Sequence, residues 1–273
     1  MSIIIMAETK VNHQKKKPLV LVISGQDPSG AGILADIETC AANGCLALTL
    51  ITSVTCQNTS CYRSKVDIDE KFLVQQLNLL MKEFNPDAVK IGLIPNTAMC
   101  ITLSSYIRER LSKCPIVLDP VLKTGGNNSY LTDAELPSAL RKNLFPLTTV
   151  VTPNKRELAK LGETESIYKA LDRISDLGAK AILATDMADD KGTILNILSQ
   201  GPSKGTVEYV MRRYPESSHG TGCTLSSAVA CELAKGRTIF QSVASAQLFT
   251  HSSVEHSNSY ETQQTIPNRF FWL

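Results

Sequence analysis

Residues 19–43, LVLVISGQDPSGAGILADIETCAAN, contain the pattern on which the fold depends. The stretch opens with an uninterrupted apolar run over residues 19–24, which is typical of a strand that is buried on both faces. Gly25 ends this run, and the helical spacing that follows over residues 30–43 stops at Gly44. The order of strand, loop and helix predicts the first unit of an α/β fold.

The same alternation continues along the chain. Strands separated by helices of this length need crossover connections, which give a largely parallel sheet covered on both faces. We therefore predict a three-layer α/β/α sandwich with a mainly parallel central sheet. Further strands are predicted at residues 46–55, 87–92, 115–118, 148–151 and 179–184, and helices at residues 70–84, 97–111, 133–143, 155–161 and 167–177.

The last third of the chain departs from this alternation. Residues 192–198 and 206–210 have strand spacing on either side of a Gly-Pro-Ser-Lys-Gly turn, which predicts a hairpin. Two more helices are predicted at residues 221–235 and 239–256. Because we find no internal repeat and no low-complexity linker, we predict one domain over residues 18–273.

Composition limits the classes of protein that the chain can belong to. Hydrophobic residues make up 43% and charged residues 20%, and the net charge of +2 predicts neither a nucleic-acid nor a membrane surface. In residues 1–17 a short apolar run precedes three lysines, the reverse of a secretory signal, so we predict a mobile leader and a cytoplasmic protein. The eight cysteines form no C-x-x-C pair, which favours reduced thiols, and the four histidines lack zinc-site spacing.

Polar and glycine residues follow five of the predicted strands. In open α/β sheets, ligands bind outside the carboxyl ends of the strands, so these residues are candidates for a binding site. The candidates are Gly25, Gln26, Asp27, Asp36, Thr55, Gln57, Asn58, Gly92, Asp119, Thr152, Asn154 and Glu157.

A glycine-rich turn, HGTGCTLSSA at residues 219–228, opens directly into a predicted helix. Glycines allow a close backbone approach to a ligand, and the free amides of a first helical turn attract anions. The turn therefore predicts an anion hole suited to a phosphoryl group. Cys223 lies at the helix start, where the same field is expected to favour its thiolate and make it a proton acceptor. The alternative is a buried cysteine in an ordinary glycine-capped turn.

Three other motifs are less specific. GAGILA at residues 30–35 matches the dinucleotide fingerprint, but it lies too far from its strand and lacks the acidic residue after the second strand. No P-loop sequence is present. Asn154-x-x-Glu157 places an amide and a carboxylate on one helical face, which suits either Mg²⁺ with nucleotide phosphates or a plain helix cap. Asp119 is either a second acid of that site or a turn carboxylate.

Together these residues resemble the hydroxymethylpyrimidine and phosphomethylpyrimidine kinases of thiamine biosynthesis, a branch of the ribokinase-like family. The resemblance implies a ribokinase-like fold, phosphorylation of hydroxymethylpyrimidine or its monophosphate, use of ATP and Mg²⁺, and a homodimer. Its six motifs are GQDPSGAGILAD at 25–36, VTCQNT at 54–59, KIG at 90–92, LDPV at 118–121, TPN at 152–154 and HGTGCT at 219–224.

The resemblance also implies roles for individual residues. Cys223 takes the position of the catalytic base, where ribokinase-like enzymes in general have an aspartate, and this points to the pyrimidine branch. Gly220, Thr221 and Gly222 would hold the γ-phosphate beside it. By the same resemblance, Gly25, Asp36, Thr55, Gln57 and Leu93 would bind the pyrimidine, Asn154, Thr185 and Thr221 the nucleotide, and Asp119 and Glu157 the metal ion.

Two departures from the family pattern affect the predicted site. The loop SGAG at residues 29–32 is one residue shorter than the SGGAG of the family, and TDMA at residues 185–188 stands where the family has Lys-Gly-Gly-His. A lysine that neutralises the transferring phosphate is therefore missing, and Lys123 and Lys191 are the candidates to replace it. The alternative functions are a pyridoxal kinase of the same fold, a non-catalytic pyrimidine-binding protein and, more distantly, a nicotinamide oxidoreductase.

Overall fold

A mixed nine-stranded sheet organises the computed structural model, which describes residues 16–123, 131–188 and 192–273. Most of the predicted leader lies outside these residues. The strand order is β3-β2-β1-β4-β5-β6-β7-β8-β9, with parallel pairing from β2 to β7 and antiparallel pairing at both edges. The prediction of a mainly parallel sheet is confirmed. The strands are β1 (Leu19–Gln26), β2 (Leu46–Gln57), β3 (Tyr62–Asp67), β4 (Ala88–Ile91), β5 (Ile116–Leu118), β6 (Val150–Val151), β7 (Ile182–Ala184), β8 (Thr193–Ser199) and β9 (Thr206–Arg212).

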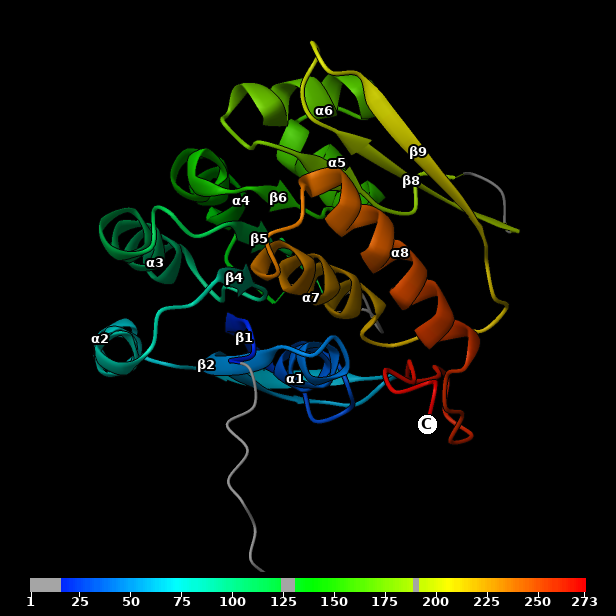
Figure 1. Cartoon of the computed structure of the whole chain (residues 1–273), viewed down its shortest axis with the longest axis horizontal. Coiled ribbons are helices and arrows are strands. Elements are labelled where there is room, and N and C mark those ends of the chain that lie inside the picture. The colour runs from blue at the N-terminus through cyan, green and yellow to red at the C-terminus, as the bar shows by residue number, and fades with distance from the viewer. Residues whose placement is uncertain (1–15, 124–130, 189–191) are drawn as a thin grey trace, which may run out of the picture.

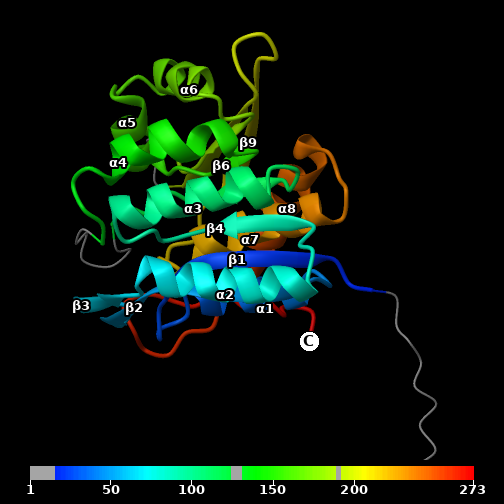
Figure 2. The same cartoon turned by 90° about the vertical axis from the view of Figure 1, so that its left-hand side faces the viewer.

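Helices cover both faces of this sheet and complete the predicted three-layer α/β/α sandwich (Figures 1 and 2). Among the described residues, no helix has the length and apolar character of a membrane span. One face carries α2 (Glu70–Glu83), α3 (Thr97–Arg110), α4 (Leu136–Ala139), α5 (Lys155–Gly162) and α6 (Ile167–Asp176), and the other carries α1 (Gly32–Ala42), α7 (Thr221–Ala234) and α8 (Ile239–Glu255).

The central strand β1 shows why the layers form. Successive side chains of a strand point to opposite faces of the sheet. Leu21 and Ile23 pack in the hydrophobic cluster on the α2–α6 side, and Val20 and Val22 pack in the cluster on the side of α1, α7 and α8. A strand with neighbours on both edges and helices on both faces is therefore apolar at every position, which is the pattern in the sequence.

The structure differs from the sequence prediction in two elements. Strand β3 was not predicted, because its charged residues alternate with Tyr62, Ser64 and Val66 and form no apolar run. It exists through antiparallel pairing with β2, which continues beyond its predicted end. The helix predicted at residues 133–143 is a single α-turn, α4, followed by a π-turn (Leu140–Leu144) and a 3₁₀ turn (Phe145–Leu147). Pro146 in this last turn has no amide donor to continue a helix.

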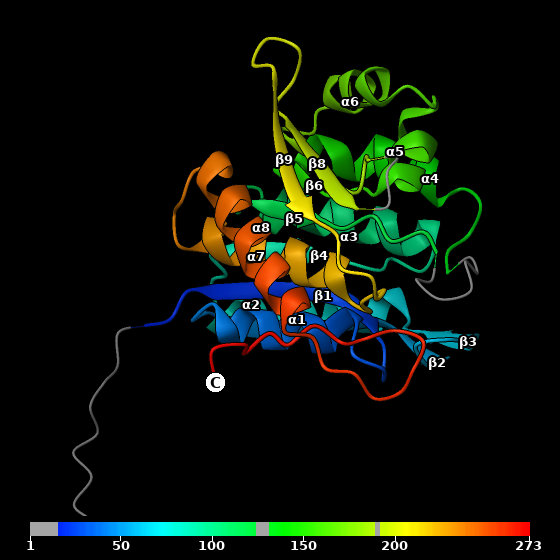
Figure 3. The ribbon, with the colours of Figure 1, turned by 90° about the vertical axis from the view of Figure 1, so that its right-hand side faces the viewer.

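The C-terminal segment, residues 257–273, returns from α8 to the start of α7. The amide of Thr265 donates to the carbonyl oxygen of Ser217 at 2.9 Å, and the amide of His219 donates to the carbonyl oxygen of Thr265 at 2.8 Å. Figure 3 shows this segment, in red, passing α1. The end of the chain is therefore attached to the glycine-rich turn.

Candidate active site

A cavity of about 210 Å³ opens at the carboxyl ends of the parallel strands. Its wall is formed by the last residues of β1 and β2, by residues that follow β1, β4, β5, β6 and β7, and by the start of α7, which is where ligands bind in open α/β sheets. The structure brings together all but two of the predicted site residues here, while their individual roles remain predictions. The predicted residues that line the cavity are Gly25, Thr55, Gln57, Leu93, Asp119, Asn154, Glu157, Thr185, Gly220, Gly222 and Cys223.

Asp36 and Thr221 are the two predicted site residues that do not line this cavity. The carboxylate of Asp36 is fully buried; it lies 2.8 Å from Lys90 Nζ and accepts a hydrogen bond from Ser227 Oγ at 2.7 Å. Thr221 Oγ1 donates to the carbonyl oxygen of Ser218 at 2.9 Å. The placement of Asp36 differs from the predicted substrate contact, because its oxygens are already committed to partners inside the protein.

Helix α7 begins without a side-chain cap. Its N-cap residue, Gly220, has a φ of 86°, in the left-handed region that favours glycine. A Cβ atom at this position would lie 2.8 Å from the carbonyl oxygen of Gly30, so the turn also needs glycine for space. The N-cap therefore offers the first-turn amides no side-chain acceptor, and the turn that carries them lines the cavity, which suits an anionic ligand.

Cys223 lies in the first turn of α7 and borders the cavity. Burial raises the pKa of its thiol to about 12; Lys90 opposes this shift, and the charges of Asp119 and Asp36 add to it. The expectation that the helix field favours the thiolate is therefore wrong, because desolvation outweighs the dipole. The amide of Gly32 acts in the opposite direction and lowers the pKa of the thiol.

Lys90 is a fully buried cation behind this cysteine, paired with Asp36. Burial alone lowers the pKa of Lys90, but the facing carboxylates of Asp36 and Asp119 raise it, so the ammonium group remains charged. A buried charge is tolerated only when it is paired in this way. No role was predicted for Lys90. The sequence feature that could have indicated a buried charge is a lysine between the apolar residues Val89 and Ile91 of a buried strand.

Two buried carboxylates, Asp119 and Glu157, lie in the cavity wall. Burial raises the pKa of Asp119, and burial together with the charge of Asp119 raises the pKa of Glu157 to about 8. A cation between them would relieve this repulsion. Within the described part of the chain, no three His, Cys, Asp or Glu side chains form a metal-binding group. Two carboxylates suit an ion such as Mg²⁺, which takes its other ligands from phosphates and water.

The start of α5 is capped by its own side chains. Asn154 Oδ1 accepts the amides of Arg156 at 3.0 Å and Glu157 at 3.1 Å, and Glu157 Oε2 accepts the amide of Asn154 at 3.0 Å. This reciprocal arrangement is a capping box. The interpretation of Asn154 as a helix cap is confirmed, although Glu157 is buried rather than solvated, and the metal and nucleotide roles remain predictions.

Thr185 occupies the position of the missing family lysine and lines the cavity. Its neighbour Asp186 has a φ of 59° and forms an ion pair with Arg213. Of the two lysines proposed as replacements, the structure places Lys123 at the cavity, whereas Lys191 lies outside the described residues.

Asp27 and His219 connect the loop after β1 to the turn before α7. His219 Nε2 lies 2.7 Å from Asp27 Oδ2, and Ser29 Oγ donates to Asp27 Oδ1 at 2.6 Å. Burial acts to raise the pKa of Asp27, but the hydrogen bonds from His219 and Ser29 lower it overall. Both residues belong to recognised motifs, yet nothing local indicated that they meet across 192 residues of chain.

A model of the phosphomethylpyrimidine kinase family matches residues 27–268. This chain belongs to that family. The resemblance drawn from the six sequence motifs is confirmed, and the match includes both the loop after β1 and most of the C-terminal segment.

Curated relatives and solved structures agree with this assignment. The chain is 33% identical over 253 residues to a probable thiamine biosynthetic bifunctional enzyme, chloroplastic, of Oryza sativa subsp. japonica, covering 88% of this chain and 45% of that protein. It spans about half the length of the plant relatives it matches. It is 31% identical to the hydroxymethylpyrimidine/phosphomethylpyrimidine kinase of Rhizobium meliloti, with coverage of 90% and 94%. An ADP complex of Bacillus subtilis pyridoxal kinase has the same fold, with a TM-score of 0.81, 27% identity and coverage of 93% and 98%.

Proposed function

We propose that this kinase-family chain transfers the γ-phosphoryl group of ATP to the hydroxymethyl group of 4-amino-5-hydroxymethyl-2-methylpyrimidine, or phosphorylates its monophosphate, in thiamine diphosphate biosynthesis. The observation that carries the proposal is that an uncapped helix entrance, a cysteine in its first turn and the amide of Gln57 meet at one cavity. Relatives named for this activity support it. Pyridoxal kinase is the second candidate, favoured by the likeness to the Bacillus subtilis enzyme.

The pyrimidine would bind at the end of the cavity formed by β1 and β2. Gln57 offers both a donor and an acceptor, which match the amino group and ring nitrogen of an aminopyrimidine. Thr55 Oγ1 donates to the carbonyl oxygen of Gln26 at 2.9 Å, so its lone pairs can accept from the ligand. A Cβ atom at Gly25 would lie 2.7 Å from the side chain of Leu93, so glycine allows the two walls to approach each other.

The start of α7 would stabilise the phosphoryl group in transfer. Its first-turn amides would supply fixed donors aimed at the charge that develops on the phosphoryl oxygens. Cys223 would receive the proton of the substrate hydroxyl group and pass its own thiol proton to an oxygen of the phosphoryl group held at the same helix start. Phosphoryl transfer depends mainly on positioning and charge, so a strong base is not required.

Asp119 and Glu157 would hold Mg²⁺, with Asn154 beside the nucleotide phosphates. The bound ion would neutralise phosphate charge, and the two carboxylates would orient it. Burial raises the pKa of both acids, and the charge of Asp119 raises that of Glu157 further, which supports this assignment.

Lys123 would supply the phosphate-facing charge that the family places at Thr185. We expect Lys123→Met to lower kcat by about 10²-fold, because one charge stabiliser is lost. Adding Thr185→Lys to that variant should restore part of the activity by returning the cation to its family position. ADP release in a coupled assay measures both effects. Unchanged kcat in Lys123→Met would show that another group carries this charge.

The proposed function is tested by measuring ADP formation with hydroxymethylpyrimidine, its monophosphate and pyridoxal in parallel. We expect turnover with one or both pyrimidines and a lower kcat/KM with pyridoxal. A preference for pyridoxal would establish the second candidate. Binding of a pyrimidine without ADP formation, with MgATP present, would instead establish a non-catalytic binding protein.

We further propose that the protein is a homodimer and acts in the cytoplasm. The homodimer rests on the family resemblance, and sedimentation equilibrium tests it. The eight cysteines, all of them free thiols, support a reducing compartment. Imaging of a tagged full-length protein tests the location.

A further inference from the structure

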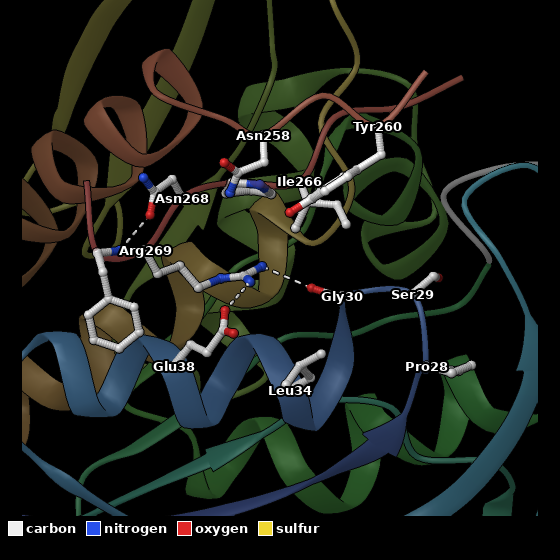
Figure 4. A pocket seen from close by; sticks show the side chains of 12 residues that line it. Pro28, Ser29, Gly30, Leu34, Glu38, Asn258, Tyr260, Ile266, Asn268 and Arg269 are labelled. Atoms are coloured by element: carbon white, nitrogen blue, oxygen red, sulfur yellow. Dashed lines mark hydrogen bonds and ion pairs between the residues drawn. The ribbon is translucent and has the colours of Figure 1, made fainter. Parts of the chain in front are cut away.

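Arg269, in the C-terminal segment, is one of the largest fully buried side chains and is only 1% exposed. Its guanidinium group makes three hydrogen bonds: Nε donates to Thr224 Oγ1 at 2.9 Å, Nη2 to the carbonyl oxygen of Gly30 at 3.0 Å, and Nη1 to Glu38 Oε2 at 2.7 Å. Figure 4 shows the side chain reaching from the C-terminal segment toward Gly30 and Glu38. Arginine suits this position because its planar fork can bond three partners in fixed directions.

The three partners of Arg269 belong to three different elements. Thr224 lies in the first turn of α7, Gly30 in the loop after β1, and Glu38 in α1. The guanidinium also packs against the glycine turn, since a Cβ atom at Gly220 would lie 2.8 Å from Arg269 Nη2. One side chain therefore joins the uncapped start of α7 to the loop after β1, which lies against it at Gly30.

The backbone of the C-terminal segment supports the same attachment. Thr265 exchanges amide and carbonyl bonds with Ser217 and His219, directly before the glycine turn. Gln264 Nε2 adds a bond to Ser217 Oγ at 2.9 Å. Because α7 lacks a cap of its own, these contacts restrain its start from outside the helix.

We propose that Arg269 is a positioning residue for phosphoryl transfer, a role that rests on the proposed function. It holds the first turn of α7 against the loop at residues 25–32, so that the amides and Cys223 keep their direction toward the cavity. Two of its three bonds go to neutral oxygens of these two segments rather than to its counter-ion Glu38. A purely structural ion pair would need only the bond to Glu38.

Steady-state kinetics of Arg269→Met test this role. We expect kcat to fall by about 10- to 100-fold, because small displacements of catalytic groups have effects of this size. The KM for the pyrimidine should stay within about threefold, since the pyrimidine contacts are made elsewhere. Arg269→Lys keeps the charge but not the fork, and should be intermediate. Glu38→Gln is the matched control, because it removes the ion pair while the bonds to Gly30 and Thr224 remain; its kcat should change little.

Chemical rescue separates positioning from general stability. A cavity of about 300 Å³ lies between the C-terminal segment and the loop after β1, with Arg269 in its wall, and it gives a small solute access to this position. Methylguanidinium at millimolar concentration should therefore raise the kcat of Arg269→Ala, whereas urea, which has the same planar shape without the charge, should not. Wild-type kcat in a folded Arg269→Met variant would overturn the proposal, as would rescue of the melting temperature without rescue of kcat.

Hydrogen exchange provides a readout that does not depend on activity. In Arg269→Met the amides of residues 217–224 should exchange faster than in the wild type, while those of α6 should not change. If the wild type phosphorylates none of the substrates, the proposed function fails, yet this exchange result still decides whether Arg269 restrains the start of α7. Unchanged exchange at residues 217–224 would contradict that restraint.

Discussion

Helices α5 and α7 both begin beside the same cavity, but only one of them is capped by its own side chains. In α5, Asn154 and Glu157 form a capping box that satisfies the amides at the helix start. In α7, the N-cap is Gly220, which has no side chain to accept from the first turn. The difference separates two tasks: the start of α5 is completed by the protein, whereas the start of α7 leaves its amides for a ligand.

The uncapped helix depends on residues far away in the sequence for its placement. His219, just before the turn, is held by Asp27, and Thr224 in the first turn is held by Arg269. The start of α5 carries its cap within four consecutive residues, and one distant hydrogen bond adds to it, from the amide of Leu122 to Glu157 Oε1 at 3.4 Å. An end that is left free for a ligand must be positioned by contacts from outside the helix.

Placing a carboxylate in the first turn of α7 is expected to have the largest effect on activity. Gly222→Asp would place an acid over the first-turn amides, so the start of α7 would resemble that of α5 and would repel phosphate. We expect kcat/KM for ATP to fall by about 10³-fold in steady-state assays, while the melting temperature stays the same or rises. Gly222→Ala is the control, because a Cβ atom there meets its nearest neighbour, Asp119, at 3.9 Å. Retained activity in the Asp variant would place the phosphate elsewhere.

Removing the thiol at the start of α7 is expected to have the next largest effect. Cys223→Ala should lower kcat by about 10²-fold through loss of the proton acceptor. The dissociation constant for the nucleotide, measured by calorimetry, should stay nearly unchanged. Cys223→Ser keeps a group able to exchange a proton, so its kcat should lie between those of the Ala variant and the wild type. If kcat is the same in the Ala variant, Cys223 is a packing residue, and the alternative interpretation of the turn is correct.

A substitution in the cap of α5 should lower the stability of the protein. Asn154→Ala removes the acceptor of two amides and should lower the free energy of unfolding by about 1 kcal/mol, as measured by urea denaturation. Lys160→Ala, an exposed change in the last turn of α5, serves as the comparison and should lie within about 0.5 kcal/mol of the wild type. Equal effects of the two substitutions would contradict the importance of the cap.

Removing the contact between Asp27 and His219 should have the smallest effect. That effect is on stability, and it should depend on pH. The pKa of Asp27 is lowered from its ordinary value of 3.8, so the carboxylate stabilises the fold above that pH and loses this contribution as the pH falls through the lowered value. Asp27→Asn should therefore be less stable than the wild type near neutral pH, and the difference should shrink in acid. Thermal unfolding at several pH values measures this. A difference that does not vary with pH would show that the charge is unimportant.

Local pattern was enough to predict the layers and most of the cavity wall. The apolar run of β1 and the helix after it indicated an α/β fold, and the residues after each strand converge on one cavity because parallel strands end at the same edge of a sheet. The prediction failed where the cause lies elsewhere in the chain. Strand β3 has no signal of its own, and its pairing with β2 creates it.

The electrostatics of the site could not be read from the chain in the same way. A glycine turn before a helix indicates a positive field, and from this a thiolate was expected at Cys223. The pKa of the thiol is instead raised, because the folded protein buries the sulfur beside Asp119 and Asp36. Arg269 likewise has no local signature, since Thr224, its partner on α7, lies 45 residues away.

The sequence of residue types determines the order of strands and helices, the loops at the sheet edge and the glycine turn. It does so because periodicity and backbone freedom are properties of residues that are neighbours in the chain. Packing alone decides which charges meet: Lys90 finds Asp36 across 54 residues, and Asp27 finds His219 across 192. Coulomb interactions and desolvation depend on distances in space, and these distances exist only once the layers have closed around the site.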